Sequence, residues 1–122
     1  MDFHLSEEQQ MVLEMVRSFT EKEVKPRASE LDAASEFPHP LVKKLAEMGL
    51  MGAFIPAEYG GSGMDLLTYI LAMEEISKAW ASLGVIMTVN NSLACDPISR
   101  FGNEAQKRKY LVPPAQGALL GC

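Results

Sequence analysis

The sequence contains little cysteine and little histidine, with two of each among 122 residues. Cys95 and Cys122 are too few for a disulfide scaffold or a four-ligand metal site, so we expect free thiols in a reducing compartment. Neither His4 nor His39 has a partner at the spacing of metal ligands. The sequence therefore predicts no metal centre and no histidine general base.

Positive charge is also scarce, because 11 lysines and arginines face 16 aspartates and glutamates, for a net charge of −5. Such a chain repels phosphate backbones and anionic lipid, which argues against nucleic acid as a partner. No basic segment followed by an apolar run opens the chain, so we expect no signal peptide. The uncharged stretch Ala79–Cys95 is rich in serine, threonine and asparagine, which favours a helix buried in protein over a membrane span. These features predict a cytoplasmic domain.

What is present is an ordinary globular composition, with 48% hydrophobic and 22% charged residues. Apolar residues recur at helical spacing, and no convincing alternating strand pattern appears before residue 118. We predict an all-α fold of about six helices in an orthogonal or up-down bundle. The expected helix starts follow the capping residues Ser6, Asp65, Ser82 and Asn103. We also expect Pro113-Pro114 to stop the last helix, and the apolar residues 118–122 to begin a strand.

Several motifs that could carry chemistry have a simpler structural interpretation. Gly60-Gly61-Ser62-Gly63 lacks the lysine of a P-loop and no strand precedes it, so it predicts a turn between helices. Glu74 and Glu75 are adjacent on a helix and do not face each other, which favours a solvated face. Cys95 has no basic neighbour to lower the pKa of its thiol, so a nucleophile is not expected. We identify no catalytic residue in the chain.

The uncharged helix that begins near Ser82 is different. Val85, Thr88, Val89 and Ser92 lie at positions i, i+3, i+4 and i+7 and share one face, with Leu93 beside it. A helix without charge but with threonine, asparagine and serine either packs against protein nearly all round or lines a cavity. The pattern alone favours packing and leaves the cavity as the alternative.

Four segments resemble one known family, in the order in which that family has them. Leu50–Asp65 resembles the G-L-x-G-x-x-x-P-E-x-x-G-G-x-G loop of acyl-CoA dehydrogenases, and Met73–Ser77 resembles the motif on their following helix. Gly84–Leu93 is similar to the version in short-chain, or butyryl-CoA, dehydrogenases. Phe101–Lys107 resembles the helix before their middle domain. The match extends over essentially the whole chain.

The resemblance implies that residues 1–117 form the N-terminal helical domain of such a flavoenzyme and that residues 118–122 begin its middle β-domain. Complete members bind FAD, convert a short-chain acyl-CoA to the trans-2-enoyl-CoA and pass electrons to an electron-transferring flavoprotein. They are commonly homotetramers, in the mitochondrial matrix of eukaryotes. The catalytic base lies in a C-terminal domain that this chain lacks. We therefore expect the chain alone to hold no FAD and to be inactive.

By the same resemblance, the uncharged helix approaches the distal end of the acyl group. The expected substrate-binding residues are Val85, Thr88, Val89, Ser92 and Leu93. We also expect apolar surface, including Leu119 and Leu120, to be exposed where the remaining domains dock. The competing hypothesis is a free-standing helical binding module derived from this domain.

Overall fold

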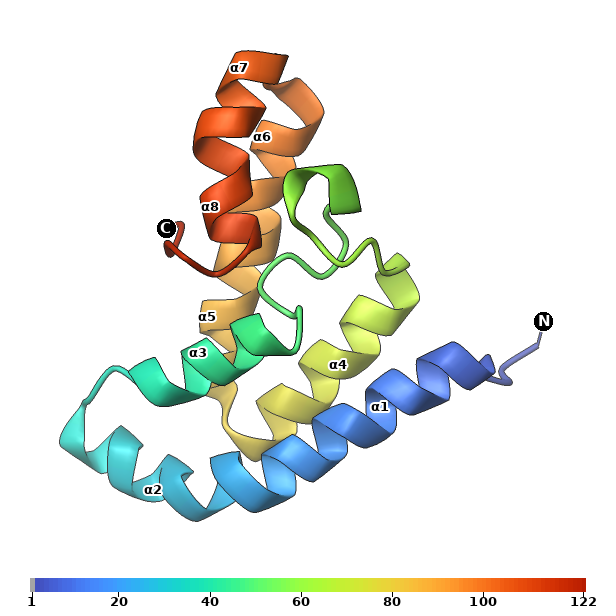
Figure 1. The fold of residues 1–122 in the computed structure, drawn as a ribbon. Coiled ribbons are helices and arrows are strands. Elements are labelled where there is room, and N and C mark those ends of the chain that lie inside the picture. The colour runs from blue at the N-terminus through green and yellow to red at the C-terminus, as the bar shows by residue number, and fades with distance from the viewer. Residues whose placement is uncertain (1) are drawn as a thin grey trace.

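The computed structural model describes residues 2–122, and every regular element within them is helical (Figure 1). The α-helices are α1 (Glu7–Phe19), α2 (Lys25–Ala34), α3 (His39–Glu47), α4 (Leu66–Ala79), α5 (Ala81–Thr88), α6 (Asp96–Phe101), α7 (Glu104–Gln106) and α8 (Val112–Ala115). Three π-helical segments are η1 (Thr20–Val24), η3 (Val89–Cys95) and η4 (Lys107–Leu111), and η2 (Ala57–Tyr59) is a 3₁₀ turn. The all-α prediction is confirmed. Because each π segment joins its neighbours without a break, the described residues form five continuous helices plus the 3₁₀ turn.

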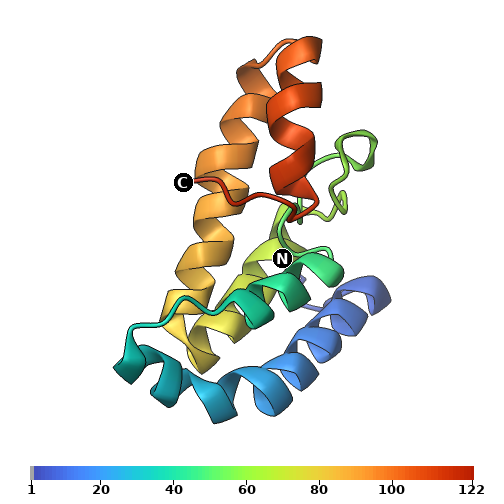
Figure 2. The ribbon, with the colours of Figure 1, turned by 60° about the vertical axis from the view of Figure 1, so that its left-hand side comes forward.

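The helices form two units that cross each other (Figures 1 and 2). The first unit, here called the N-terminal layer, contains α1–η1–α2, α3 and α4. The second, the C-terminal hairpin, contains α5–η3–α6 running one way and α7–η4–α8 returning beside it. A loop of residues 50–64 connects α3 to α4 and lies against the hairpin. The described chain therefore ends beside η3, near the middle of the hairpin.

Three of the four predicted helix starts are confirmed. The Ser6 hydroxyl accepts the Gln9 amide at 3.2 Å while the Gln9 side chain accepts the Ser6 amide at 2.9 Å, which completes a capping box. Asp65 caps α4, and Asn103 forms a second capping box at α7. The prediction for Ser82 is wrong. Trp80 has an extended backbone (φ −160°, ψ 110°) that separates α4 from α5. Helix α5 therefore begins at Ala81, before Ser82 and not after it.

The prediction that Pro113-Pro114 stops the last helix is also wrong. Helix α8 continues through both prolines to Ala115. Because α8 continues η4 without a break, both prolines lie in the last turn of a longer helix, and the N–H groups that they lack are missing where the register changes from π to α. The chain turns away two residues after Ala115, at Gly117, whose φ of +75° is a conformation that glycine adopts without strain.

Two apolar clusters hold the molecule together. The larger fills the N-terminal layer and reaches α5, with Val16, Phe19, Val24, Leu31, Leu41, Val42, Leu45, Leu50, Met51, Ala53, Tyr69, Ala72, Ile76, Leu83 and Met87 buried. The smaller joins the loop to the hairpin and contains Ile55, Tyr59, Cys95, Leu111 and Ala115. The 50–64 loop thus contributes to both clusters and connects the two units.

The glycine-rich loop is a structural turn, as the sequence predicts. The amides of Ser62, Gly63 and Met64 donate to Gly52, Ile55 and Ala53 oxygens at 2.8–2.9 Å. A phosphate would need those same N–H groups, and they are already bonded within the loop. Gly61 packs so closely on the backbone that an added Cβ would lie 2.1 Å from the Ile55 oxygen. Only glycine fits there.

Residues 118–122 form no strand in this structure. They run beside η3, where the Gly121 amide donates to the Asn90 side chain at 2.9 Å. The boundary between residues 117 and 118 stays a prediction. Among the helices of residues 2–122, none has both the length and the apolar character needed to cross a membrane.

Candidate functional site

The helix α5–η3 carries the candidate site, and its buried face fixes its orientation. Leu83, Gly84 and Met87 are buried against the N-terminal layer. Gly84 is needed for this approach, because a Cβ there would lie 2.1 Å from the Ser77 hydroxyl of α4. Helix α5 therefore packs closely on α4, and its other faces are left for a ligand or for further protein.

The five predicted site residues do not share one environment. Val85, Val89 and Leu93, spaced four residues apart, form an apolar ridge in which Val85 is 59% and Leu93 68% exposed while Val89 is half-buried. Thr88 and Ser92 lie on a different side and border a cavity against α4. The ridge, here meaning these three residues, and the Thr88–Ser92 face thus have separate surroundings.

The cavity beside α4 has a volume of about 430 Å³. It is lined by Phe54, Leu66, Tyr69, Ile70, Met73, Thr88, Ser92, Asp96 and Arg100. Its hydroxyl groups are directed inward to the protein, since Ser92 donates to the Thr88 oxygen at 2.7 Å and Thr88 to the Met73 sulfur at 2.9 Å. The buried Tyr69 hydroxyl has no hydrogen-bond partner, and burial raises the pKa of Tyr69. Apart from the Asp96–Arg100 ion pair and the Tyr69 hydroxyl, the lining of this cavity is mostly apolar.

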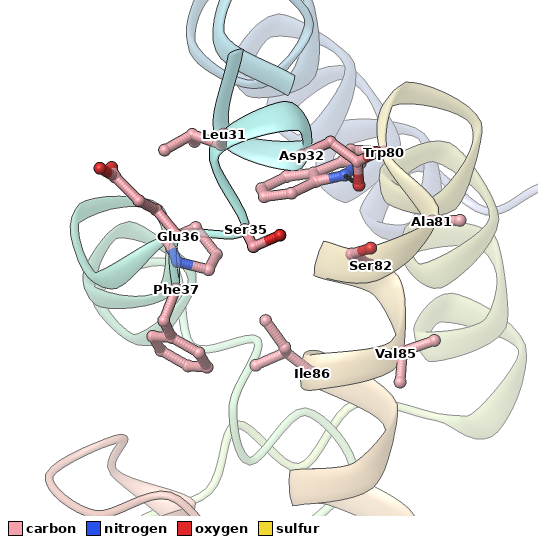
Figure 3. A pocket seen from close by; sticks show the side chains of 11 residues that line it. Leu31, Asp32, Ser35, Glu36, Phe37, Trp80, Ala81, Ser82, Val85 and Ile86 are labelled. Atoms are coloured by element: carbon pink, nitrogen blue, oxygen red, sulfur yellow. Dashed lines mark hydrogen bonds between the residues drawn. The ribbon is translucent and has the colours of Figure 1, made fainter. Parts of the chain in front are cut away.

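A second cavity, of about 540 Å³, separates the end of α2 from the start of α5 (Figure 3). Ile86 points into it from α5, and Phe37 lies on the opposite side. The Trp80 indole closes one end and donates to the Asp32 carboxylate at 3.1 Å. Val85 lies at the edge of this cavity. The ridge therefore begins at the rim of this second cavity, here called the Trp80 cavity.

A third cavity, of about 450 Å³, lies at the other end of the ridge. Leu93 and Ala94 of η3 form one side of it, and Leu119 and Leu120 form part of the other. Both of these leucines are exposed, which agrees with the apolar surface expected from the sequence. The ridge thus runs from the Trp80 cavity to the segment 118–122.

Two buried asparagines hold this helix in place, and sequence reasoning assigned neither of them a role. Asn91 accepts the Ala53 amide at 2.8 Å and donates to the Leu50 oxygen at 2.8 Å and the Met87 oxygen at 2.9 Å. Both side chains are fully buried. The sequence does contain a sign of this role: two adjacent asparagines on a helix without charge are expected to be buried. Buried amides need hydrogen-bond partners, so such a pair predicts bonds to other segments. Their partners in the loop could not be identified from spacing.

The asparagines lie in the π segment η3. A π segment inserts into an α-helix as a local change of register, and such segments are frequent at functional sites. Asn91 and Ser92 each donate to a carbonyl four residues earlier, so side chains satisfy oxygens at the point where the register changes. Because the π segment begins at Val89, regular helical spacing does not give the direction of Ser92.

Two titratable groups that the sequence singled out, Cys95 and Glu75, have pKa values shifted by their surroundings. Burial raises the pKa of the Cys95 thiol to about 11, which leaves it protonated and unreactive at neutral pH. Both cysteines are free, as predicted. Glu75 is not simply a solvated carboxylate: it accepts from Arg17 at 3.1 Å, and this bond lowers its pKa. No group of three metal-binding side chains occurs in residues 2–122.

Comparison with known proteins identifies the fold. The family model described as "Acyl-CoA dehydrogenase, N-terminal domain" matches residues 6–118. The chain belongs to the acyl-CoA dehydrogenase family. The short-chain specific acyl-CoA dehydrogenase of Clostridium acetobutylicum is 49% identical over 121 residues, and the human mitochondrial short-chain enzyme is 47% identical over 118. These alignments cover 99% and 97% of this chain but only 32% and 29% of the relatives. The chain therefore spans about a third of the length of the relatives it matches.

Solved structures agree with this assignment. Butyryl-CoA dehydrogenase of Megasphaera elsdenii matches with a TM-score of 0.91 at 40% identity, covering 98% of this chain and 32% of that one. A chain in a structure described as the electron transferring flavoprotein of Acidaminococcus fermentans matches with a TM-score of 0.93 at 45% identity, again covering 98% of this chain and 32% of its own length. The resemblance noted in the sequence is confirmed, and the chain is the N-terminal helical domain of this family.

Proposed function

We propose that this chain is part of an enzyme that oxidises a short-chain acyl-CoA to the trans-2-enoyl-CoA. Within that enzyme, the ridge of Val85, Val89 and Leu93 lines the distal part of the acyl group. The observation that carries the proposal is the exposure of Val85 and Leu93, the two ends of this apolar ridge, on the uncharged segments α5 and η3. Exposed apolar side chains in a row are covered by a ligand or by other protein in a stable assembly.

The cofactor of the proposed reaction is FAD, which would accept the electrons removed from the acyl group. The described residues do not fit a flavin site, because the loop amides that could hold its phosphates are bonded to the loop itself. We therefore propose that the remaining two thirds of the enzyme bind FAD and supply the base. The part of this chain is to bind the acyl tail and to exclude water.

Further proposals concern partners and location. Electrons would pass to an electron-transferring flavoprotein, and the complete enzyme would be a homo-oligomer, for which the family suggests a tetramer. The exposed Leu93, Leu119 and Leu120 support docking of further protein and argue against a free-standing module. Free cysteines support a reducing compartment, which is the cytoplasm or the mitochondrial matrix.

The volume of the ridge side chains should then set the acyl length that is accepted. Each buried methylene contributes about 0.8 kcal/mol to binding, and apolar pockets discriminate by about 10–200-fold per methylene at best. In the complete enzyme, Val89→Ala should shift the kcat/KM ratio towards hexanoyl-CoA and octanoyl-CoA relative to butyryl-CoA. Val89→Phe should shift it the other way.

Two further variants test this assignment. Leu67→Ala removes an exposed aliphatic side chain of α4 that borders none of the three cavities, and it should leave the ratio unchanged. Thr88→Val alters the cavity beside α4, so a changed ratio there would place the acyl tail against the Thr88–Ser92 face instead. An unchanged ratio in both Val89 variants, with lowered thermal stability, would show that Val89 is only a packing residue.

A further inference from the structure

Besides a 4.0 Å contact with the Cys95 sulfur of its own helix, Asn90 makes hydrogen bonds to three other segments of the chain. Its amide nitrogen donates to the Met51 oxygen at 2.7 Å and to the Pro114 oxygen at 3.0 Å. Its amide oxygen accepts the Gly121 N–H at 2.9 Å. The side chain is fully buried, so water does not compete for these groups. Asn90 thus joins the 50–64 loop, the end of α8 and the segment 118–122.

Asn91, the next residue, is a natural comparison. It is equally buried and also makes three hydrogen bonds, to Leu50, Ala53 and Met87. None of these partners lies beyond residue 91. The two asparagines therefore fix the loop together, whereas only Asn90 also bonds the segment 118–122.

The segment 118–122 also fits closely against the helix at this point. A Cβ on Gly121 would lie 2.1 Å from the Ala94 Cβ, so only glycine can approach η3 closely enough to bond Asn90. Gly121 has no left-handed backbone angle, which means that the requirement is for space and not for conformation. Two independent features thus hold residue 121 in one position: the Asn90 oxygen that accepts its amide, and the space beside Ala94 that only glycine fits.

This position has a consequence for the ridge. With Gly121 held on η3, Leu119 and Leu120 line the same cavity as Leu93, which is the exposed end of the ridge. We propose that Asn90 is a positioning residue that, through the Gly121 amide, places Leu119 and Leu120 as a wall of the acyl site beside Leu93. The inference rests on the proposed function only where it names the acyl site. The placement of the segment stands on the contacts alone.

The first test measures amide hydrogen exchange of residue 121 in this chain by NMR. Asn90→Ala should raise its exchange about tenfold, the factor that corresponds to one neutral hydrogen bond. Asn91→Ala, the matched control, should destabilise the fold comparably but leave residue 121 protected. Equal exchange of residue 121 in both variants, or an unprotected Gly121 amide in the original chain, would overturn the proposal.

A second pair of variants keeps the test valid if Asn90→Ala does not fold. Gly121→Ala leaves the bonds from Asn90 to Met51 and Pro114 intact but should displace the segment and expose the amide of residue 121. Adding Ala94→Gly removes the opposing methyl group and should restore protection. A folded Gly121→Ala variant that keeps its protection would contradict the geometry, and so would a double variant with no recovery.

The final test uses the complete enzyme and acyl-CoA substrates. A displaced wall should raise KM severalfold for Asn90→Ala and Gly121→Ala with little change in kcat. Unchanged KM in both variants would show that the segment does not border the substrate. If the unmodified enzyme oxidises no acyl-CoA, the proposed function fails, while the exchange result still decides the role of Asn90.

Discussion

The N-terminal layer and the region around the C-terminal hairpin are stabilised by different interactions. In the layer, α1, α3 and α4 pack through aliphatic side chains such as Val16, Leu45 and Ile76, all fully buried. In the second region, Asn90 and Asn91 of η3 make three hydrogen bonds to the 50–64 loop. Three more join them to Met87, Pro114 and Gly121. The apolar cluster there is small. Non-directional packing dominates one region, and directed bonds dominate the other.

This difference matters because the two kinds of interaction fail differently. Apolar packing tolerates a change of shape, since a similar volume still excludes water. A buried side-chain amide tolerates no apolar replacement, because each backbone group that it bonded loses its partner. Each such loss costs about 1–3 kcal/mol of unfolding free energy. The hairpin region, which carries the ridge, is therefore the more precisely positioned of the two.

The largest expected effect comes from comparing a replacement by leucine in each of the two regions. Ile76→Leu in the layer should cost less than about 1.5 kcal/mol of unfolding free energy, as volume-conserving core changes do. Asn91→Leu should cost about 3 kcal/mol or more, because the Ala53 amide and the Leu50 and Met87 oxygens lose their partner. Urea unfolding followed by circular dichroism gives both values. Similar costs in the two variants would remove the distinction between the regions.

A smaller effect is expected from helix caps, which are local and should act alike in both regions. Asp65→Ala in the layer and Asn103→Ala in the hairpin should each cost about 1 kcal/mol. The two caps differ in their pH dependence. The Thr68 hydroxyl and amide donate to Asp65 at 2.7 and 2.8 Å and lower the pKa of its carboxyl.

The sign of that dependence follows from the lowered pKa in the folded state. The cap of Asp65 is at full strength above the ordinary aspartate pKa of about 4 and weakens as the pH falls through the lower folded value. The stability difference between the original chain and Asp65→Ala should therefore shrink below pH 4. The difference for Asn103→Ala should stay constant, because an amide does not titrate. Parallel pH profiles for the two variants would contradict this explanation.

The smallest effect is expected at the surface of the N-terminal layer. Lys78 lies 2.9 Å from Glu74, and both side chains are more than half exposed. Water and salt screen such a pair, so Lys78→Ala should leave the urea midpoint unchanged within error. A clear loss of stability that disappears in 1 M salt would show that surface charge contributes to the layer as well as packing.

Sequence analysis and structure agree best where the information is local. Ser6, Asp65 and Asn103 could be recognised as caps because each bonds an amide three residues away. They disagree where distant groups decide. Helix α5 begins at Ala81 rather than after Ser82, with Trp80 extended and bonded to Asp32 of α2. Residues 118–122 lie along η3 without forming a strand, because their partner in this structure is a helix side chain.

The sequence by itself determined the helical class, the family and the uncharged helix that carries the candidate site, because periodicity, caps and motif order are properties of neighbouring residues. The tertiary structure decided which side chains of that helix point where. Thr88 and Ser92 border the cavity beside α4, Val85 and Leu93 border two other cavities, and the two asparagines fix η3 to the loop. Their bonds span 24 to 41 residues of sequence, apart from those to Met87 and Cys95. Buried amides require partners but do not specify them, so only the packed chain shows which backbone groups they meet.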